Sequence, residues 1–319
     1  MNLTGIRKPA NLSDVKNIIN KAKNLSLYVL RGNIDLETTE SIKDLVFGRE
    51  ASDLFNGKII KRISFRNCLF DNINFGHSNF KSVEFEKCYF KYANFLCSVL
   101  KDTSFCSCEM NYSKFSGSKM DSVIFLNNEI TCSNFEDLNA HRVKFMSTDL
   151  TDSSFKHSEF EDSGFINSIL RSCCFSHSKF NNLKIGSTDL RGIDFSSSVG
   201  LLNPIDFLKE NFEWENNCLI VYKVFGVNYD INPNWIIEEG SIISEEVNYD
   251  RTLDCACGIS VGNIKLISIM SFSYGNKQVW KCRILPEWLP GVVVPYNSIC
   301  QVRSSKIQLI EKIPYPRSL

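Results

Sequence analysis

A five-residue period of large apolar side chains runs through the middle of the chain. Between residues 65 and 195 every fifth position is large and apolar except Ala140, and 18 of these 27 positions are Phe. In order they are Phe65, Phe70, Phe75, Phe80, Phe85, Phe90, Phe95, Leu100, Phe105, Met110, Phe115, Met120, Phe125, Ile130, Phe135, Ala140, Phe145, Leu150, Phe155, Phe160, Phe165, Leu170, Phe175, Phe180, Ile185, Leu190 and Phe195. Neither a helix of period 3.6 nor a strand of period 2 buries positions five apart. The chain is therefore predicted to turn a corner once per repeat.

A second column lies two residues before each of these positions, and its members are mostly small or β-branched. Cys68, Ser78 and Val83 are typical, and the exceptions are Asn128, Leu138 and Leu183. These two coupled columns resemble the pentapeptide-repeat family, whose motif has a central Leu or Phe and a small residue two positions earlier. The resemblance covers residues 61–199 and implies a right-handed, quadrilateral parallel β-helix with four repeats per coil. At about 4.8 Å between strands, 27 repeats predict a solenoid of about seven layers.

Residues 1–60 lack this period and are predicted to form a partly helical cap on the open end of the solenoid. Ser13 is a suitable N-cap for a helix that buries Val15, Ile18, Ile19 and Ala22. A second helix is expected from Thr38 or Thr39 through Ile42, Leu45 and Val46, ending at Gly48.

Residues 200–319 differ abruptly in composition, because all four Trp and seven of the eight Pro lie there. Short apolar runs separated by turn residues predict a small mixed-β domain. The runs are Cys218–Phe225, Trp235–Ile237, Ile264–Met270, Gln278–Ile284 and Val292–Val294. The domain is loosely similar to modules appended to pentapeptide repeats, a likeness that implies no function. The predicted fold class is all-β dominated.

Charge and cysteine usage restrict the class of partner and the compartment. The 36 basic and 36 acidic side chains cancel, which argues against direct binding of nucleic acid or of an anionic membrane. No apolar run reaches the length of a membrane span, so a soluble protein is expected. An odd number of scattered cysteines, 13, favours a reducing compartment, and we expect a cytoplasmic protein with protein partners.

The cysteines of the C-terminal region are the candidates for chemistry. Cys255 and Cys257 could supply a nucleophile, or could join Cys282 and Cys300 in a zinc site. A cysteine nucleophile needs a base, however, and all four histidines lie in the repeats. The spacing also differs from that of paired zinc knuckles. No catalytic residue and no cofactor are therefore predicted.

The outer surface of a square coil can be derived from the sequence, because residues 20 apart stack on one face. One outward column is apolar and consists of Cys106, Leu126, Met146 and Ile166, with Ile124 beside it. Such a strip is covered by a terminal segment, by a second copy or by a partner, and we expect self-association through it or through a solenoid end. A second outward column is acidic and contains Glu109, Glu129 and Asp149.

These features favour a non-catalytic protein-interaction scaffold, with a rigid repeat rod and a C-terminal recognition or assembly domain. The family resemblance supplies one alternative, since some pentapeptide-repeat proteins bind DNA gyrase through acidic ladders that imitate duplex phosphates. Interspersed basic residues such as Lys114, Lys144 and Arg171 weaken that reading as a DNA-mimicking inhibitor or protector. A second alternative is an effector or defence-related factor with a metal-binding C-terminal domain.

Overall fold

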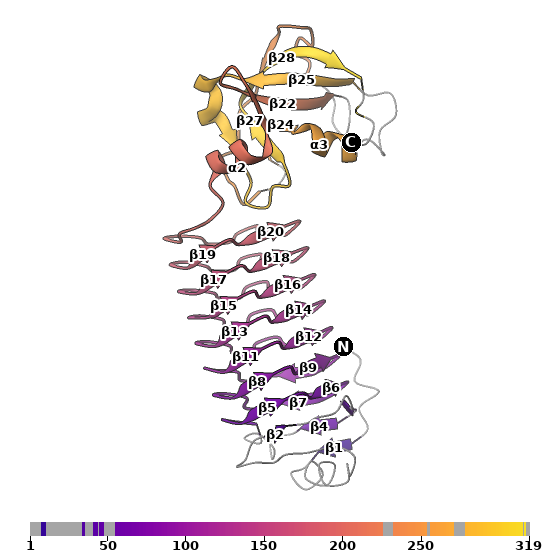
Figure 1. Ribbon diagram of the computed structural model, residues 1–319, viewed down its shortest axis with the longest axis vertical. Coiled ribbons are helices and arrows are strands. Elements are labelled where there is room, and N and C mark those ends of the chain that lie inside the picture. The colour runs from indigo at the N-terminus through magenta and orange to yellow at the C-terminus, as the bar shows by residue number, and fades with distance from the viewer. Residues whose placement is uncertain are drawn as a thin grey trace. The chain divides into compact units, whose positions relative to one another are not determined.

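A computed structural model describes residues 8–10, 34–35, 41–43, 45–47, 55–225, 232–253, 256–270, 278–314 and 316. The chain divides into two compact units, residues 1–201 and residues 202–319 (Figure 1). The first unit is a parallel β-solenoid and the second contains an antiparallel sheet, so the predicted all-β class, with a β-solenoid followed by a β-rich domain, is confirmed. In these described ranges no helix has the length and apolarity needed to cross a bilayer.

Four stacked faces form the solenoid, two of which are continuous eight-stranded parallel sheets in the described residues (Figure 1). The β13 face consists of β2 (Ile34–Asp35), β5 (Ile59–Lys61), β8 (Asn79–Lys81), β11 (Val99–Lys101), β13 (Lys119–Asp121), β15 (Asn139–His141), β17 (Glu159–Glu161) and β19 (Lys179–Asn181). The β14 face consists of β3 (Ser41–Lys43), β6 (Ser64–Arg66), β9 (Glu84–Glu86), β12 (Ser104–Cys106), β14 (Ile124–Leu126), β16 (Lys144–Met146), β18 (Gly164–Ile166) and β20 (Lys184–Gly186).

The other two faces are held mainly by single bridges. The β7 face begins with β1 (Lys8–Ala10), β4 (Leu45–Phe47), β7 (Leu69–Asp71) and β10 (Tyr89–Lys91), and continues as bridges from Glu109 to Asp189. Among the residues that the structure describes, the fourth face contains only bridges, from Asn74 to Asp194. On all four faces the residues of neighbouring complete coils pair 20 positions apart, as the sequence predicts.

The corners explain the period of five. Every fifth residue from Arg62 to Ser197 has a positive φ, between +49° and +71°. This left-handed conformation is unfavourable for most residues and is best tolerated by Gly, Asn, Asp and His. Hydrogen bonds to the next coil stabilise it: the Asn127 N–H, for example, donates to the Met146 carbonyl at 3.0 Å. Each repeat is thus one short extended segment and one fixed corner.

Two continuous stacks of phenyl rings fill the axis of the solenoid. Phe65, Phe85, Phe105, Phe125, Phe145 and Phe165 stack behind the β14 face with centroids 4.6–5.2 Å apart. The opposite stack runs from Phe55 to Phe175 at 4.6–5.0 Å. The stacks meet edge to face, as Phe115 and Phe125 do at 6.1 Å and 89°. Aliphatic residues such as Leu100 and Met110 fill the other two sides of the middle coils.

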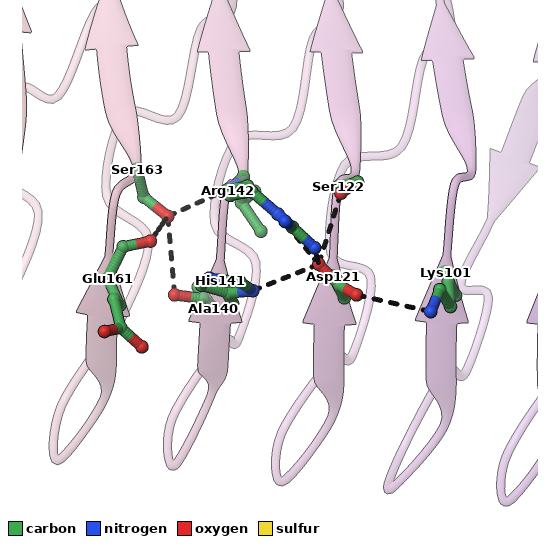
Figure 2. Close-up of polar contacts among 9 residues, drawn as sticks. Lys101, Asp121, Ser122, Ala140, His141, Arg142, Glu161 and Ser163 are labelled. Carbon is green, nitrogen blue, oxygen red and sulfur yellow. Dashed lines mark hydrogen bonds and ion pairs between the residues drawn. The ribbon is translucent and has the colours of Figure 1, made fainter.

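The small column ties neighbouring coils together through buried hydroxyls. Ser163 Oγ donates to the Glu161 carbonyl at 2.8 Å and to the Ala140 carbonyl at 3.4 Å (Figure 2). It also accepts the Val143 N–H at 3.0 Å. A small side chain is therefore required both by the space and by the backbone groups that it satisfies.

The three exceptions in the small column differ in burial. Asn128 is buried and makes the bonds of a serine, donating to the Phe105 carbonyl at 2.8 Å and accepting the Cys108 N–H at 2.7 Å. Leu138 and Ala140 are both 1% exposed, so this repeat exchanges its large and small side chains and conserves core volume. Leu183 lies near the end of the solenoid and is half-buried. The series ends at Gly200, where a β-carbon would collide with the Phe180 carbonyl.

The predicted helix from Thr38 or Thr39 to Val46 is wrong, because β3 and β4 are strands that extend the solenoid backward. Phe47 is fully buried and stacks on Phe70 with centroids 4.9 Å apart. Register explains the error: Phe47 pairs with a residue 23 positions later rather than 20. Phe47 and Phe55 are eight residues apart, so a strict period of five misses this coil. The predicted helix after Ser13 lies outside the described residues.

The C-terminal unit contains one antiparallel sheet in the order β23-β28-β25-β22-β24-β27-β26, with β21 beside β22. The bounds are β21 (Glu213–Glu215), β22 (Cys218–Phe225), β23 (Ile242–Ser244), β24 (Ile259–Gly262), β25 (Gln278–Ile284), β26 (Val292–Val293), β27 (Gln301–Ser304) and β28 (Lys306–Ile313). Helix α2 (Pro204–Asn211), helix α3 (Ile264–Met270) and a 3-10 helix (Pro286–Gly291) complete the described elements. Strands β22 and β25 coincide with the predicted runs.

Two of the runs predicted as strands are not strands. Residues Ile264–Met270 form α3, because the Asn263 side chain accepts the Leu266 N–H at 2.8 Å and caps the helix. The buried Leu266 and Ile267 then lie on one side and the exposed Lys265 and Ile269 on the other. Trp235 lies in a turn, with its N–H bonded to the Asn232 carbonyl at 2.9 Å.

The phenyl stacks predict a large penalty for one central truncation. Phe125→Ala should lower the free energy of unfolding by about 3–5 kcal/mol, because it removes a buried ring between two stacked neighbours. Urea unfolding of the full chain measures this loss. Ile124→Ala, at the adjacent exposed position, is the matched control and should cost less than about 1 kcal/mol. Equal losses in the two variants would contradict the assignment of Phe125 to the core.

Candidate interaction surface on the solenoid

The apolar column lies on the β14 face as a continuous ladder. Cys106, Leu126, Met146 and Ile166 pair in register from β12 to β18 and are each half-buried. Ile124, on the same face, is 39% exposed. Burial, followed by the charge of Glu86, raises the pKa of the Cys106 thiol, which therefore behaves as a small apolar group. The four side chains present one uninterrupted apolar strip.

The acidic column lies around the next corner, on the β7 face. Glu109, Glu129 and Asp149 are joined by parallel bridges, after which Ile169 interrupts the series before Asp189. Glu129 accepts a hydrogen bond from Asn111 at 2.9 Å, and Asp149 accepts two from Thr151. In the described part of the chain, neither Glu129 nor Asp149 forms an ion pair. Three carboxylates are thus held at the spacing of the ladder.

Asp189 has a different environment from the three carboxylates that precede it. Its Oδ2 accepts from Arg191 at 2.6 Å and from Arg171 at 2.8 Å. The Arg191 guanidinium holds the pKa of the Asp189 carboxyl well below its usual range. The negative column is therefore neutralised at its far end.

An open groove of about 510 Å³ follows the corner between these two faces. Corner residues line it, namely Ser107, Asn127, Ser147 and Asn167, together with Glu109, Glu129, Asp149 and Ile169. Cys108, Asn128 and Thr148 also contribute to its lining. The repeat pattern alone does not predict this groove, although the Ser and Asn residues of the corner column mark where it lies. The structure places the predicted apolar and acidic columns on either side of it.

The repeats match known sequence and structural families. The family description "Pentapeptide repeat region" matches residues 58–135, and "Pentapeptide repeats (8 copies)" matches residues 144–182. The solenoid belongs to the pentapeptide-repeat family. No curated protein sequence matches the chain significantly.

Several solved structures of pentapeptide-repeat proteins are similar to about half of the chain. QnrB1, a plasmid-mediated fluoroquinolone resistance protein, is 16% identical with a TM-score of 0.37, covering 52% of this chain and 92% of its own. HetL from the cyanobacterium Nostoc sp., involved in heterocyst differentiation regulation, is 9% identical with a TM-score of 0.30, covering 59% and 94%. Rfr23 from the cyanobacterium Cyanothece is 12% identical with a TM-score of 0.15, covering 45% and 88%.

On the β13 face of the pentapeptide-repeat solenoid, one carboxylate is neutralised by its neighbours. Figure 2 shows Asp121 at the centre of a polar cluster, where it accepts from Arg142 Nη2 at 2.6 Å and from His141 Nδ1 at 3.1 Å. Ser122 and Lys101 lie at 3.2 Å and 3.7 Å from its carboxylate. The Arg142 guanidinium lowers the pKa of Asp121 to about 2. This cluster stabilises the coil and leaves no unneutralised carboxylate at its centre.

The C-terminal thiols that were considered for zinc are not brought together in the described residues. Strand pairing of Ile259 with Ser304 and of Gly262 with Gln301 puts Cys257 and Cys300 at opposite ends of the β24–β27 pair. Cys282 is fully buried in β25, where burial raises the pKa of its thiol to about 12. Cys255 lies outside the described residues. No group of three potential metal ligands occurs among the residues that the structure describes.

The Asp121 cluster predicts a pH-dependent contribution to stability. The folded carboxyl titrates near 2, below its usual value, so its stabilising effect is complete above about pH 4 and is lost as the pH falls toward 2. Asp121→Asn should therefore lower the melting temperature at pH 7, with a difference from wild type that shrinks at about pH 2.5. Asp137→Asn, an exposed corner substitution, is the control and should show no such convergence. A difference that does not change with pH would contradict the assignment.

The reactivity of each cysteine toward an alkylating reagent should follow its exposure. Iodoacetamide at neutral pH is expected to label the exposed Cys97, Cys132 and Cys257 in the native protein. The buried Cys173 and Cys282 should remain unlabelled, because burial raises the pKa of both thiols to about 12 and blocks access. Peptide mass spectrometry before and after denaturation measures each site. Fast native labelling of Cys173 would show that the coil is open there.

Proposed function

We propose that this chain is a non-catalytic protein-interaction scaffold whose solenoid binds a protein partner along the corner groove. The observation that carries the proposal is the row of carboxylates at Glu109, Glu129 and Asp149, which parallel bridges hold side by side along the lining of the groove. Like charges at this spacing repel one another, and a cationic partner removes that repulsion. The rigid coil holds the row in place before binding, which lowers the entropic cost of recognition.

The adjoining columns specify the chemistry of the partner segment. Basic side chains fit the acidic column, and apolar side chains next to them fit the strip that contains Leu126 and Met146. The Ser and Asn hydroxyl and amide groups of the corner offer hydrogen bonds between the two. A protein segment with neighbouring Lys or Arg and apolar residues matches this order.

The same geometry favours binding of a protein segment over the alternative in which the solenoid imitates a DNA duplex. Three rungs of the ladder span only about 10 Å at about 4.8 Å per interval, whereas a duplex carries one charge per about 1.7 Å of axis. Ile169 interrupts the acidic column, and the arginines at Asp189 neutralise the next carboxylate. A continuous duplex-like surface would require both positions to be free acids.

The C-terminal unit is proposed as a second recognition or assembly module. It has its own core, which includes Leu219, Val221, Ile284 and Val302. Its buried Cys282 has a raised pKa and is unsuited to nucleophilic catalysis, which supports a binding role. Exposed free thiols at Cys97 and Cys132 support a reducing, cytoplasmic compartment.

Charge neutralisation in the groove tests the proposal. Full-length wild type and the triple variant Glu109→Gln, Glu129→Gln, Asp149→Asn are immobilised and exposed to extract from the source cells. Bound proteins are quantified by isotope-labelled mass spectrometry, and cross-links locate the contact. At least one partner should cross-link to the groove and fall about tenfold or more in the variant, since each lost charge pair weakens binding.

A matched control removes three charges elsewhere on the solenoid. The variant Glu159→Gln, Glu161→Gln, Asp162→Asn changes net charge by the same amount on the β13 face and its corner. It should retain the partner, and both variants should keep the wild-type melting transition. The proposal fails if both triple variants lose the same proteins, or if no captured protein depends on the groove.

A further inference from the structure

On the β14 face, the side chains at one end of the solenoid are complementary to those at the other end. Its two outward columns, read from β9 to β20, are Glu84, Ser104, Ile124, Lys144, Gly164, Lys184 and Glu86, Cys106, Leu126, Met146, Ile166, Gly186. Consider a two-fold axis parallel to the strands and midway between β14 and β16. It would place each column of one copy opposite the same column of a second copy, with the order of the coils reversed. We infer that a second copy of this chain covers the strip in this way, with the two solenoids antiparallel.

Apolar groups meet apolar groups in that arrangement. Leu126 would lie opposite Met146 of the other copy, and Cys106 opposite Ile166, so that the whole strip is removed from water. Ile124, which is 39% exposed, would contact the aliphatic stem of Lys144. Within a single copy, the four side chains of the strip are only half-buried.

Size also matches across the axis. Ser104 would face Gly164, the two smallest side chains of the central part of the face. Gly164 is buried against β20, where a β-carbon would lie 3.0 Å from the Lys184 carbonyl. The small pair leaves room for the larger Ile124 and Lys144 beside it, so the two faces can approach closely.

Unpaired charges of opposite sign lie at the two ends of the strip. Glu84 and Lys184 are exposed, and in the described part of the chain neither forms an ion pair. The two-fold axis brings Glu84 of each copy opposite Lys184 of the other, which gives two ion pairs per dimer. This complementarity identifies the occupant as a second copy and fixes its direction.

The size of the face limits the affinity. Six strands about 4.8 Å apart and about 10 Å wide give roughly 300 Å² per copy, against about 800 Å² in a standard interface. The dimer should therefore be weak and concentration-dependent, and the partner proposed above competes with the second copy for the strip that contains Leu126 and Met146. Its edge also places the acidic column of one copy beside that of the other, so neutralising Glu109, Glu129 and Asp149 should strengthen dimerisation. That direction is opposite to the loss of partner binding expected above, so the two proposals can fail separately.

Sedimentation of the full chain between about 5 and 300 µM tests this inference. The mass should rise toward a dimer with concentration, and Leu126→Asp with Met146→Asp should keep it a monomer. Leu96→Asp and Val99→Asp change exposed apolar residues on other faces and should leave the dimer intact. A monomer at every concentration, as when another segment of the same chain covers the strip, overturns the inference.

A charge exchange tests the antiparallel two-fold geometry itself. Glu84→Lys alone and Lys184→Glu alone should each raise the dissociation constant about tenfold, because each places like charges opposite one another twice. The double variant Glu84→Lys, Lys184→Glu should restore the wild-type value. A double variant as weak as the single ones overturns the arrangement, even if a dimer persists.

Discussion

One distance governs the solenoid, because two different interactions require nearly the same rise between coils. Hydrogen-bonded strands lie about 4.8 Å apart, and stacked phenyl rings in the core have centroids 4.6–5.2 Å apart. The backbone ladder and the aromatic stack therefore reinforce each other without strain. Buried serine hydroxyls such as that of Ser163 add a third contact at the same rise. Every outward side chain inherits this spacing, which turns single residues into columns.

Much of the fold could be predicted because the repeat is local. Each pentapeptide contains its own corner, its own large residue and its own small residue, so the pattern is visible without long-range information. The first described coil was missed because Phe47 and Phe55 are eight residues apart, which breaks the period although the pairing continues. Helix α3 was missed because its apolar, β-branched run resembles a strand, and only the cap from Asn263 decides for a helix.

The surface could be predicted only in part. Because residues 20 positions apart stack on neighbouring coils, the apolar and acidic columns can be predicted from the sequence. The sequence does not reveal which charges are neutralised by neighbours. Asp121 and Asp189 are each neutralised by arginines, whereas the partners of Glu129 and Asp149 among the described residues are the neutral side chains of Asn111 and Thr151. That difference depends on side-chain reach between coils, and it separates a structural carboxylate from one that is available for recognition. The groove between the columns likewise follows from the corner geometry.

The eight-residue interval before Phe55 has a consequence for how such a chain can vary. Extra residues introduced beside a corner lengthen an exposed connection and cost little closure entropy, while the strands before and after keep their partners. Extra residues inside a strand would instead displace the large or small side chain of that repeat from the core. Natural variation in length should therefore concentrate at the corners. A peptide grafted by design could likewise be inserted at the corner of any chosen coil along the solenoid.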